Sequence, residues 1–218
     1  MKKDFSAMNL PNKLTLTRII LLAPLLVAII LYEVLIKVLL VQYYIAGRIL
    51  LAIMLLIFVA AMITDYFDGK IARERNLITT FGKLWDPLAD KLIVSTTLIG
   101  LCAFGFVPIW ITVLFVARDI VVDGFRIVMV QNNVEIAASK WGKLKTLFQT
   151  IAIIVLLCIG IGYDYSSPNV YLGLVNHPTL MYFVALYIIN IPTMVALFFS
   201  IFSGVNYFKA IKPYIQSK

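Results

Sequence analysis

The chain has 218 residues, of which 62% are hydrophobic, and its mean hydropathy is +0.97. A soluble domain is closer to half apolar, so this composition excludes a protein with a large aqueous domain. The formal net charge of +8 favours partners with phosphates or anionic head groups, but not nucleic acid, because almost no soluble part remains to form a basic binding face.

Long apolar runs predict six transmembrane helices, because about 20 apolar residues cross the ~30 Å hydrocarbon layer and lipid offers the backbone no hydrogen-bond partner. We expect these helices at about residues 17–40, 47–73, 84–104, 108–131, 144–163 and 179–208. Residues 1–218 are expected to form a single, all-α integral membrane domain without internal repeats. Cys102 and Cys158 lie in apolar runs and indicate packing, with neither a disulfide nor a metal site.

The distribution of Lys and Arg predicts the orientation, because cytoplasmic connections carry an excess of these residues. Both ends of the chain and the second-to-third and fourth-to-fifth connections are rich in them, whereas the opposite side offers only Lys37 and Arg48 near helix ends. Both termini are therefore expected to be cytoplasmic. The protein is expected to be a multi-pass protein of the cell (cytoplasmic) membrane, with its active site facing the cytoplasm.

Four aspartates lie at the cytoplasmic ends of the second and third predicted helices. A spacing of three places Asp65 and Asp68 on one helical face, and a spacing of four does the same for Asp86 and Asp90. A short connection makes these helices antiparallel neighbours, so the carboxylates are expected to converge near the membrane surface. Ionisable groups at this depth are functional candidates by default.

Converging carboxylates repel one another, by about 4 kcal/mol for a pair ~4 Å apart at an effective dielectric constant of about 20. Oxygen ligands without nearby His or Cys indicate that Mg²⁺ or Mn²⁺ removes this repulsion. More carboxylates than one ion needs suggest two ions, as suits phosphoryl chemistry. One alternative is ordinary ion pairing with Arg73, Lys83 and Lys91. Another is that Asp86 merely caps a helix beginning at Pro87.

The segment from Asp65 to Asp90 resembles the signature of the CDP-alcohol phosphatidyltransferase family. It runs Asp65-x-x-Asp68-Gly69-x-x-Ala72-Arg73, then eight residues, then Gly82-x-x-x-Asp86-x-x-x-Asp90, and it matches at every defined position. Six helices with cytoplasmic termini are also this family's architecture, so the resemblance covers essentially the whole chain. It implies an enzyme that transfers a phosphatidyl group from CDP-diacylglycerol to an alcohol and releases CMP.

The resemblance also implies a role for each position of the signature. Asp65, Asp68 and Asp86 would hold the metals, and Asp90 would complete the second metal site and act as the general base. The CDP-lipid-binding residues implied are Asp65, Asp68, Gly69, Ala72, Arg73 and Gly82. The residues themselves suggest the same chemistry, in which metals neutralise the diphosphate and a carboxylate takes the proton of the attacking hydroxyl.

The signature does not specify the acceptor alcohol, so basic residues elsewhere are the guide. Arg118 and Arg126 lie eight residues apart on nearly one face of the fourth predicted helix. They suggest an acceptor that already carries a phosphate, for which arginine offers a bidentate fork. Internal pairing with Asp119 and Asp123 would also explain these arginines.

Five further residues are candidates for binding the acceptor phosphate: Lys140, Lys143, Arg18, Asn12 and Thr15. Anchoring at a cytoplasmic surface would also explain the lysines. The other three belong to a Pro-Asn-x-x-Thr-x-x-Arg pattern that is otherwise a polar lead-in to the first helix. The segments around both groups, and residues 86–92, resemble the phosphatidylglycerophosphate-forming branch of the family. Asp123 departs from this branch, where a small hydroxyl residue is expected, and this weakens the acceptor assignment for the fourth helix.

The sequence therefore predicts an enzyme that uses CDP-diacylglycerol and glycerol 3-phosphate among membrane lipids, and it is compatible with a homodimer. Inositol phosphate, serine and phosphatidylglycerol stay open as acceptors. A divalent-cation transporter is a rival from another class, but transporters place acids near the bilayer midplane, whereas these aspartates lie at helix ends beside Lys and Arg. The lone His177 receives no role.

Overall fold

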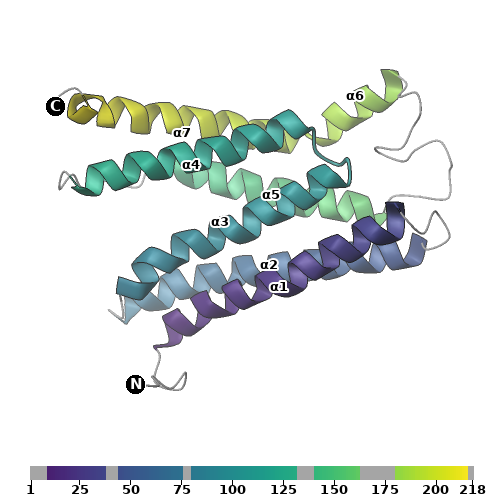
Figure 1. Cartoon of the computed structure of the whole chain (residues 1–218), viewed down its shortest axis with the longest axis horizontal. Helices are drawn as coiled ribbons and strands as arrows, with labels where there is room; N and C mark the ends of the chain where they lie inside the picture. Colours follow the sequence, from purple (N-terminus) through teal and green to yellow (C-terminus); the bar gives the residue numbers. More distant parts are fainter. Residues whose placement is uncertain (1–8, 38–43, 76–79, 132–139, 163–179, 216–218) are drawn as a thin grey trace. The chain divides into compact units, whose positions relative to one another are not determined.

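The computed structural model describes residues 9–37, 44–75, 80–131, 140–162 and 180–215. All regular structure within these ranges is helical, which confirms the predicted all-α class (Figure 1). The helices are α1 (Leu10–Lys37), α2 (Tyr44–Glu74), α3 (Thr80–Ala103), α4 (Ile109–Gln131), α5 (Lys140–Gly162), α6 (Leu180–Ile189) and α7 (Ile191–Ile215).

Four of these helices are long and apolar enough to cross a membrane, as a multi-pass membrane protein requires. The candidate spans are Leu10–Leu35, Ile45–Ala72, Trp141–Gly162 and Ile191–Pro213. The helices α3 and α4 are of comparable length, but their apolar runs are interrupted by charged side chains, which are Lys83, Asp86, Asp90 and Lys91 in α3 and Arg118, Asp119, Asp123 and Arg126 in α4. The count of six spans therefore stays a prediction.

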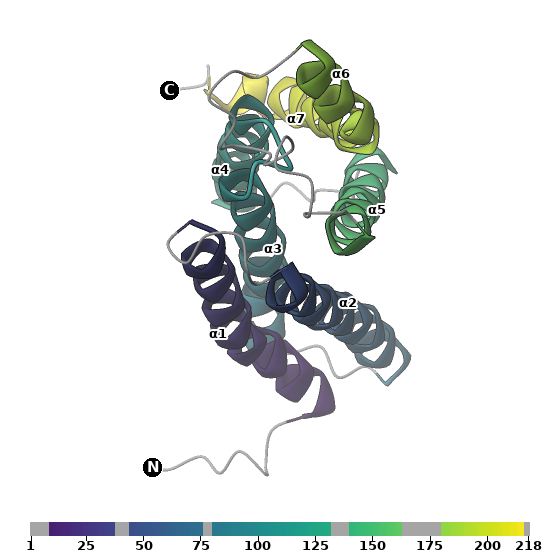
Figure 2. The same cartoon turned by 90° about the vertical axis from the view of Figure 1, so that its right-hand side faces the viewer.

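The chain forms two compact units, one of residues 1–103 with 157–168 and the other of residues 104–156 with 169–218. In the first unit, α1 packs against α2 and α3, which also contact each other (Figure 1 and Figure 2). In the second unit, α4 packs along α7, and α6 meets the start of α7. That the whole chain acts as one domain stays a prediction.

The packing of α1 follows from the spacing of its buried residues. Leu25, Ala28 and Tyr32 recur at three or four residues and are buried, whereas Val27 and Ile30 between them are exposed. Exposed aliphatic side chains of this kind suit contact with lipid. The helix α3 passes close to α1 at Gly100, where an added Cβ would lie 2.9 Å from Cδ1 of Ile29.

Four helices begin earlier than predicted, α1 by seven residues and α2, α3 and α5 by three or four. The first starts at Leu10 instead of about residue 17, and the backbone N–H of Lys13 donates to the carbonyl of Asn9 (3.1 Å). Pro11 is tolerated in the first turn because its missing N–H would have no partner within the helix. The third helix starts at Thr80, so Asp86 lies inside it and the alternative of a simple cap at Asp86 is wrong.

The last predicted helix is divided at Asn190 into α6 and α7. Pro192 lacks a backbone N–H and therefore cannot donate to the carbonyl four residues earlier, which favours a break at this point. The buried side chain of Asn190 donates through Nδ2 to the carbonyls of Phe106 (2.7 Å) and Leu186 (2.9 Å). The side chain of Asn190 thus stabilises the break between α6 and α7.

Candidate active site

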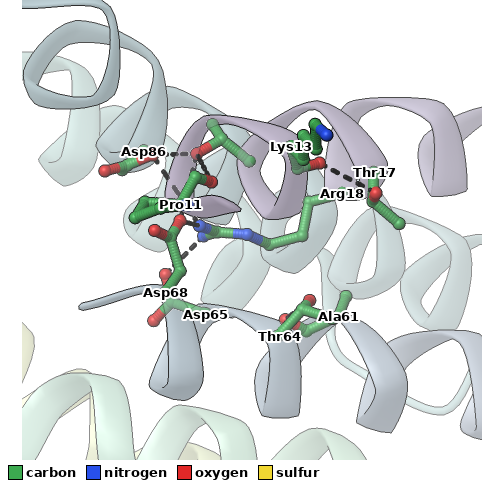
Figure 3. A network of polar contacts seen from close by, with 10 residues as sticks. Pro11, Lys13, Thr17, Arg18, Ala61, Thr64, Asp65, Asp68 and Asp86 are labelled. Carbon is green, nitrogen blue, oxygen red and sulfur yellow. Dashed lines mark hydrogen bonds and ion pairs between the residues drawn. The ribbon is translucent and has the colours of Figure 1, made fainter. Parts of the chain in front are cut away.

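Three of the four predicted metal-binding aspartates meet at one side chain of α1 (Figure 3). Nη1 of Arg18 donates to Oδ1 of Asp65, and Nη2 donates to Oδ2 of Asp68 at 2.5 Å. The same Nη2 lies 3.8 Å from Oδ1 of Asp86. Both aspartates of α2 therefore reach one guanidinium, as their spacing of three predicts, and α3 supplies the third carboxylate.

The aspartate cluster, defined as Asp65, Asp68 and Asp86 with Thr15 and Arg18, is buried on one side and open on the other. The side chains of Arg18 and Asp68 are 0% and 2% exposed. Those of Asp65 and Asp86 are 46% and 36% exposed. A ligand can therefore approach the cluster along these two aspartates, while Arg18 and Asp68 form its floor.

The hydroxyl of Thr15 lies close to more acceptor oxygens than it can donate a hydrogen bond to. Its Oγ1 is 3.0 Å from Oδ2 of Asp68, 3.2 Å from the carbonyl of Pro11, and within hydrogen-bonding reach of Oδ1 of Asp86. A threonine hydroxyl has one proton to donate, so only one of these oxygens accepts it at a time. The crowding of oxygens favours a cation at this place.

The charge and the donor atoms of the aspartate cluster fit a divalent metal. Three carboxylates and one guanidinium leave a net charge of −2. Among the described residues, buried Oδ1 of Asp68 has no hydrogen-bond partner, and carboxylate and hydroxyl oxygens are the ligands that Mg²⁺ and similar ions prefer. No three acidic, His or Cys side chains in the described ranges are grouped closely enough to share an ion, and Arg18 lies between the aspartates instead.

The other signature residues lie on the same helices. Asp90 follows Asp86 by one turn of α3 and is partly buried, Gly82 is buried, and Gly69 and Ala72 of α2 are partly exposed. Arg73 belongs to α2, but its side chain lies outside the described part of the structure, as does that of Lys83. The nucleotide-binding and base roles of these residues stay predictions.

A second group of charged side chains, the α4–α5 ion cluster, consists of Arg118, Asp119 and Lys145 in the second unit. Nζ of Lys145 donates to both carboxylate oxygens of Asp119, at 2.8 and 2.7 Å. Nη1 of Arg118 donates to Oδ1 of Asp119 at 2.8 Å, and Nε donates to the backbone carbonyl of Ser200 at 2.8 Å. The alternative that Arg118 pairs with a neighbouring acid is thus confirmed for Asp119.

Arg126 lies further along α4 and contacts α7. Its Nη2 donates to the hydroxyl of Tyr207 at 3.2 Å, and its Cζ lies 5.2 Å from the centroid of the same ring. Both predicted arginines of α4 therefore face α7, as expected for residues eight apart on a helix.

The remaining acceptor candidates belong to both units. Thr15 and Arg18 belong to the aspartate cluster, and Asn12 lies partly buried in the first turn of α1. Lys143 is exposed in the first turn of α5. The side chain of Lys140 and the whole of His177 lie outside the described residues.

Sequence reasoning missed Lys145 and the partnership of Thr15 and Arg18 with the aspartates. Lys145 belongs to the same lysine-rich segment as Lys140 and Lys143, for which surface anchoring is one explanation, but it is buried, as is Gln149 one turn later. Two polar residues four apart at the start of an apolar helix were the available signal for a buried polar face. No local pattern links α1 to residues 47 and 50 positions later.

Comparison with known proteins gives consistent matches. Residues 8–206 match the family model described as CDP-alcohol phosphatidyltransferase. A Bacillus subtilis protein named CDP-diacylglycerol–glycerol-3-phosphate 3-phosphatidyltransferase is 37% identical over 92% of this chain and 93% of its own length. Proteins of the same name from Mycoplasma pneumoniae and Rickettsia typhi are 33% and 35% identical, over 96% and 94% of this chain and 90% and 98% of their own lengths.

Proposed function

This chain belongs to the CDP-alcohol phosphatidyltransferase family, and we propose that it transfers the phosphatidyl group of CDP-diacylglycerol to glycerol 3-phosphate. The products are phosphatidylglycerophosphate and CMP. The observation that carries this proposal is the shared name of relatives that match nearly the whole chain. The acidic cluster on α2 and α3 supports it, because a diphosphate needs a cation beside it.

In the proposed reaction, a hydroxyl oxygen of glycerol 3-phosphate forms a bond to the phosphorus that carries diacylglycerol. The bond from that phosphorus to the oxygen of CMP breaks, and CMP leaves with the electron pair. Asp90 takes the proton of the attacking hydroxyl, as a general base. This carboxylate is suited to the task because it lies on α3 one turn from Asp86.

Members of the family generally depend on a divalent metal. Asp65, Asp68, Asp86 and Asp90 would hold Mg²⁺ or Mn²⁺, which when bound neutralises charge on the diphosphate. Arg18 and Thr15 position the carboxylates of this site, and we assign them there because they contact the aspartates directly. Gly69, Ala72, Gly82 and Arg73 would bind the nucleotide, as in the family signature.

The acceptor phosphate is assigned to the second unit, at Arg118 and Arg126. The α4–α5 ion cluster contains two cations and one carboxylate, so its net charge is +1. A largely buried positive charge favours an anionic partner. Lys140 and Lys143 at the start of α5 would add positive charge for the same ligand, and Asn12 is kept as a further candidate.

The same proposal requires the catalytic residues to face the compartment that supplies soluble glycerol 3-phosphate. Six spans with both termini in the cytoplasm meet this requirement, because they place the C-terminal end of α2 and the N-terminal end of α3 on the cytoplasmic side. The Lys and Arg residues near these ends support that orientation by the positive-inside rule.

The test is the release of CMP by the purified protein in detergent with CDP-diacylglycerol and Mg²⁺ or Mn²⁺. Glycerol 3-phosphate, inositol phosphate, serine and phosphatidylglycerol are supplied separately as acceptors. We expect release only with glycerol 3-phosphate and none after addition of EDTA. Release with another acceptor alone would contradict the proposed substrate, and Mn²⁺ flux into liposomes without CMP release would contradict the enzyme itself.

A further inference from the structure

The α4–α5 ion cluster contains two residues, Asp119 and Lys145, to which the family signature assigns no role. Both side chains are largely buried, at 8% and 10% exposure. A buried ion pair is weak evidence for stability, because well-packed apolar side chains of similar size often serve as well or better. The contacts of this pair with Arg118 suggest what else it does.

Arg118 is held at two of its three nitrogens. Nε donates to the carbonyl of Ser200 on α7, and Nη1 donates to Asp119 on its own helix. The third nitrogen, Nη2, makes no hydrogen bond to any residue that the structure describes. The plane of the guanidinium is therefore set by α4 and α7, and its Nη2 edge is left for another acceptor.

Lys145 determines how much positive charge remains at this edge. A carboxylate next to Arg118 alone would neutralise it and would compete with any anionic ligand. Lys145 contacts both oxygens of Asp119, whereas Arg118 contacts only one. The carboxylate thus orients Arg118 while the lysine balances its charge, and the cluster keeps a net charge of +1.

We propose that Asp119 and Lys145 are positioning residues that hold Arg118 oriented and positively charged toward the phosphate of the acceptor. The inference rests on the proposed function, and it adds the residues that determine affinity for a phosphorylated alcohol. The backbone of α7 packs close to Arg118 at Gly204, where an added Cβ would lie in ordinary van der Waals contact with Cγ and Nε of Arg118, at 3.6 Å.

The test compares Asp119→Asn, Lys145→Gln and the double variant in the CMP-release assay, with KM measured for each substrate. Removing Asp119 alone leaves two largely buried cations without a carboxylate, whereas the double variant keeps the net charge of the cluster at +1, so the double variant is expected to fold. It lacks the charge-assisted bond that orients Arg118, so its KM for glycerol 3-phosphate should rise roughly tenfold or more. Its KM for CDP-diacylglycerol should not change.

The KM values for the acceptor are expected to follow an order among the variants that a merely structural ion pair would not produce. Lys145→Gln lets Asp119 neutralise Arg118, so its acceptor KM should rise at least as far as in the double variant. Asp119→Asn leaves two cations and should raise the acceptor KM least, and Asp119→Glu should recover most of the wild-type value. Because KM is measured on the folded fraction, this order can be read even from a destabilised variant.

Lys209→Gln is a matched control, because it removes one exposed lysine of α7 and should leave both KM values unchanged. Wild-type KM values in all three variants of the pair would overturn the positioning role, while transfer to glycerol 3-phosphate by the wild type would keep the proposed function. Loss of that transfer in the wild type would instead contradict the proposed function.

Discussion

At the level of single residues, the two polar clusters differ in the sign of their charge. The aspartate cluster carries −2 and the α4–α5 ion cluster carries +1. Each sign matches the ligand proposed for it, a divalent cation in the first unit and the phosphate of the acceptor in the second. Substitutions that change one charge should therefore affect one substrate or the metal, but not both substrates.

The first prediction concerns Asp90. Asp90→Asn keeps the shape of the side chain but removes the proposed proton acceptor, while Asp65, Asp68 and Asp86 remain as the proposed metal ligands. We expect kcat to fall roughly 10²- to 10⁴-fold, the usual contribution of a general base, with little change in the KM for CDP-diacylglycerol. Initial rates of CMP release measure both constants. Equal activity of the variant and the wild type would remove Asp90 from the role of base.

The second prediction concerns Arg118. Arg118→Ala removes the guanidinium proposed to bind the acceptor, so the KM for glycerol 3-phosphate should rise roughly 10- to 100-fold, as expected for a hydrogen bond to a charged group. The KM for CDP-diacylglycerol should stay within about twofold of wild type on the same principle. The KM of Arg118→Lys for glycerol 3-phosphate should lie between those of the wild type and Arg118→Ala, because lysine keeps the charge but lacks the planar fork. The reverse pattern of KM changes would assign Arg118 to the nucleotide.

At the level of elements, α1 contributes to the candidate active site as well as being a candidate membrane span. Its first turns contain Thr15 and Arg18, which connect it to α2 and α3 through the aspartate cluster. Carboxylates on two different helices would otherwise repel one another. The polar contacts of α1 thus join α1, α2 and α3 at one end, and apolar packing joins them along their length.

The third prediction tests this role of Arg18. Arg18→Gln leaves buried Asp68 without its cation, so the free energy of unfolding should fall by about 3 kcal/mol, the lower end for a broken buried pair, because Asp65 and Asp86 are partly exposed. Thermal unfolding in detergent with EDTA measures the loss. Mn²⁺ should raise the Tm of the variant more than that of the wild type, since it replaces the missing positive charge.

The control for this experiment is Thr17→Val, because the exposed hydroxyl of Thr17 donates to the carbonyl of Lys13 within the same helix. Its Tm should match that of the wild type. If Mn²⁺ shifts the Tm of Arg18→Gln and of the wild type equally, Arg18 and the metal do not act on the same carboxylates.

The fourth prediction concerns the break between α6 and α7. Asn190→Ala removes two hydrogen bonds and leaves the buried carbonyl of Phe106 without the Nδ2 donor. The free energy of unfolding should fall by about 1–3 kcal/mol, measured by thermal unfolding. Thr146→Val is a suitable control, because the hydroxyl of Thr146 bonds to a carbonyl of its own helix. Equal stability of the two variants would mean that Asn190 does not hold the break.

At the level of the whole molecule, the fifth prediction is the orientation in the membrane. With six spans and cytoplasmic termini, green fluorescent protein fused after Lys218 should fluoresce in a bacterial host. Alkaline phosphatase fused in the connection between α1 and α2 should be active, because that connection would lie outside. Activity of a phosphatase fused after Lys218 would indicate the opposite orientation, with the aspartates on the outer side.

Most of the fold was predictable because lipid leaves the backbone few choices. Apolar runs located every helix, and the spacing of Asp65 and Asp68 correctly predicted that they share a face. The start of α1 was missed because residues 10–16 are partly polar, although Asn9 and Pro11 are typical of a helix beginning. The break at Asn190 was missed because Pro192, the second residue of α7, lies within a continuous apolar run that predicts a single helix.

The contacts of the candidate site were less predictable, because they join residues far apart in the chain. Arg18 was a plausible ligand for a phosphate, and only the packing of α1 on α2 brings it to the aspartates. Lys145 resembled an anchoring lysine, and only the proximity of Asp119 distinguishes it. A charged side chain at the membrane surface can anchor a helix, form an ion pair or bind a ligand. Residue type alone does not distinguish these roles.

The burial of Arg18 also constrains the order in which the protein is made. Arg18 precedes its partners on α2 by 47 and 50 residues, and Thr15 precedes Asp86 by 71. At about 5–20 residues per second, a ribosome needs roughly 3 to 10 seconds to add α2 after Arg18 has been synthesised. During this interval the guanidinium has no carboxylate, so α1 must enter the membrane with Arg18 extended toward the lipid head groups. Insertion of α2 then brings Asp65 and Asp68 to the residue with which they pair in the folded protein.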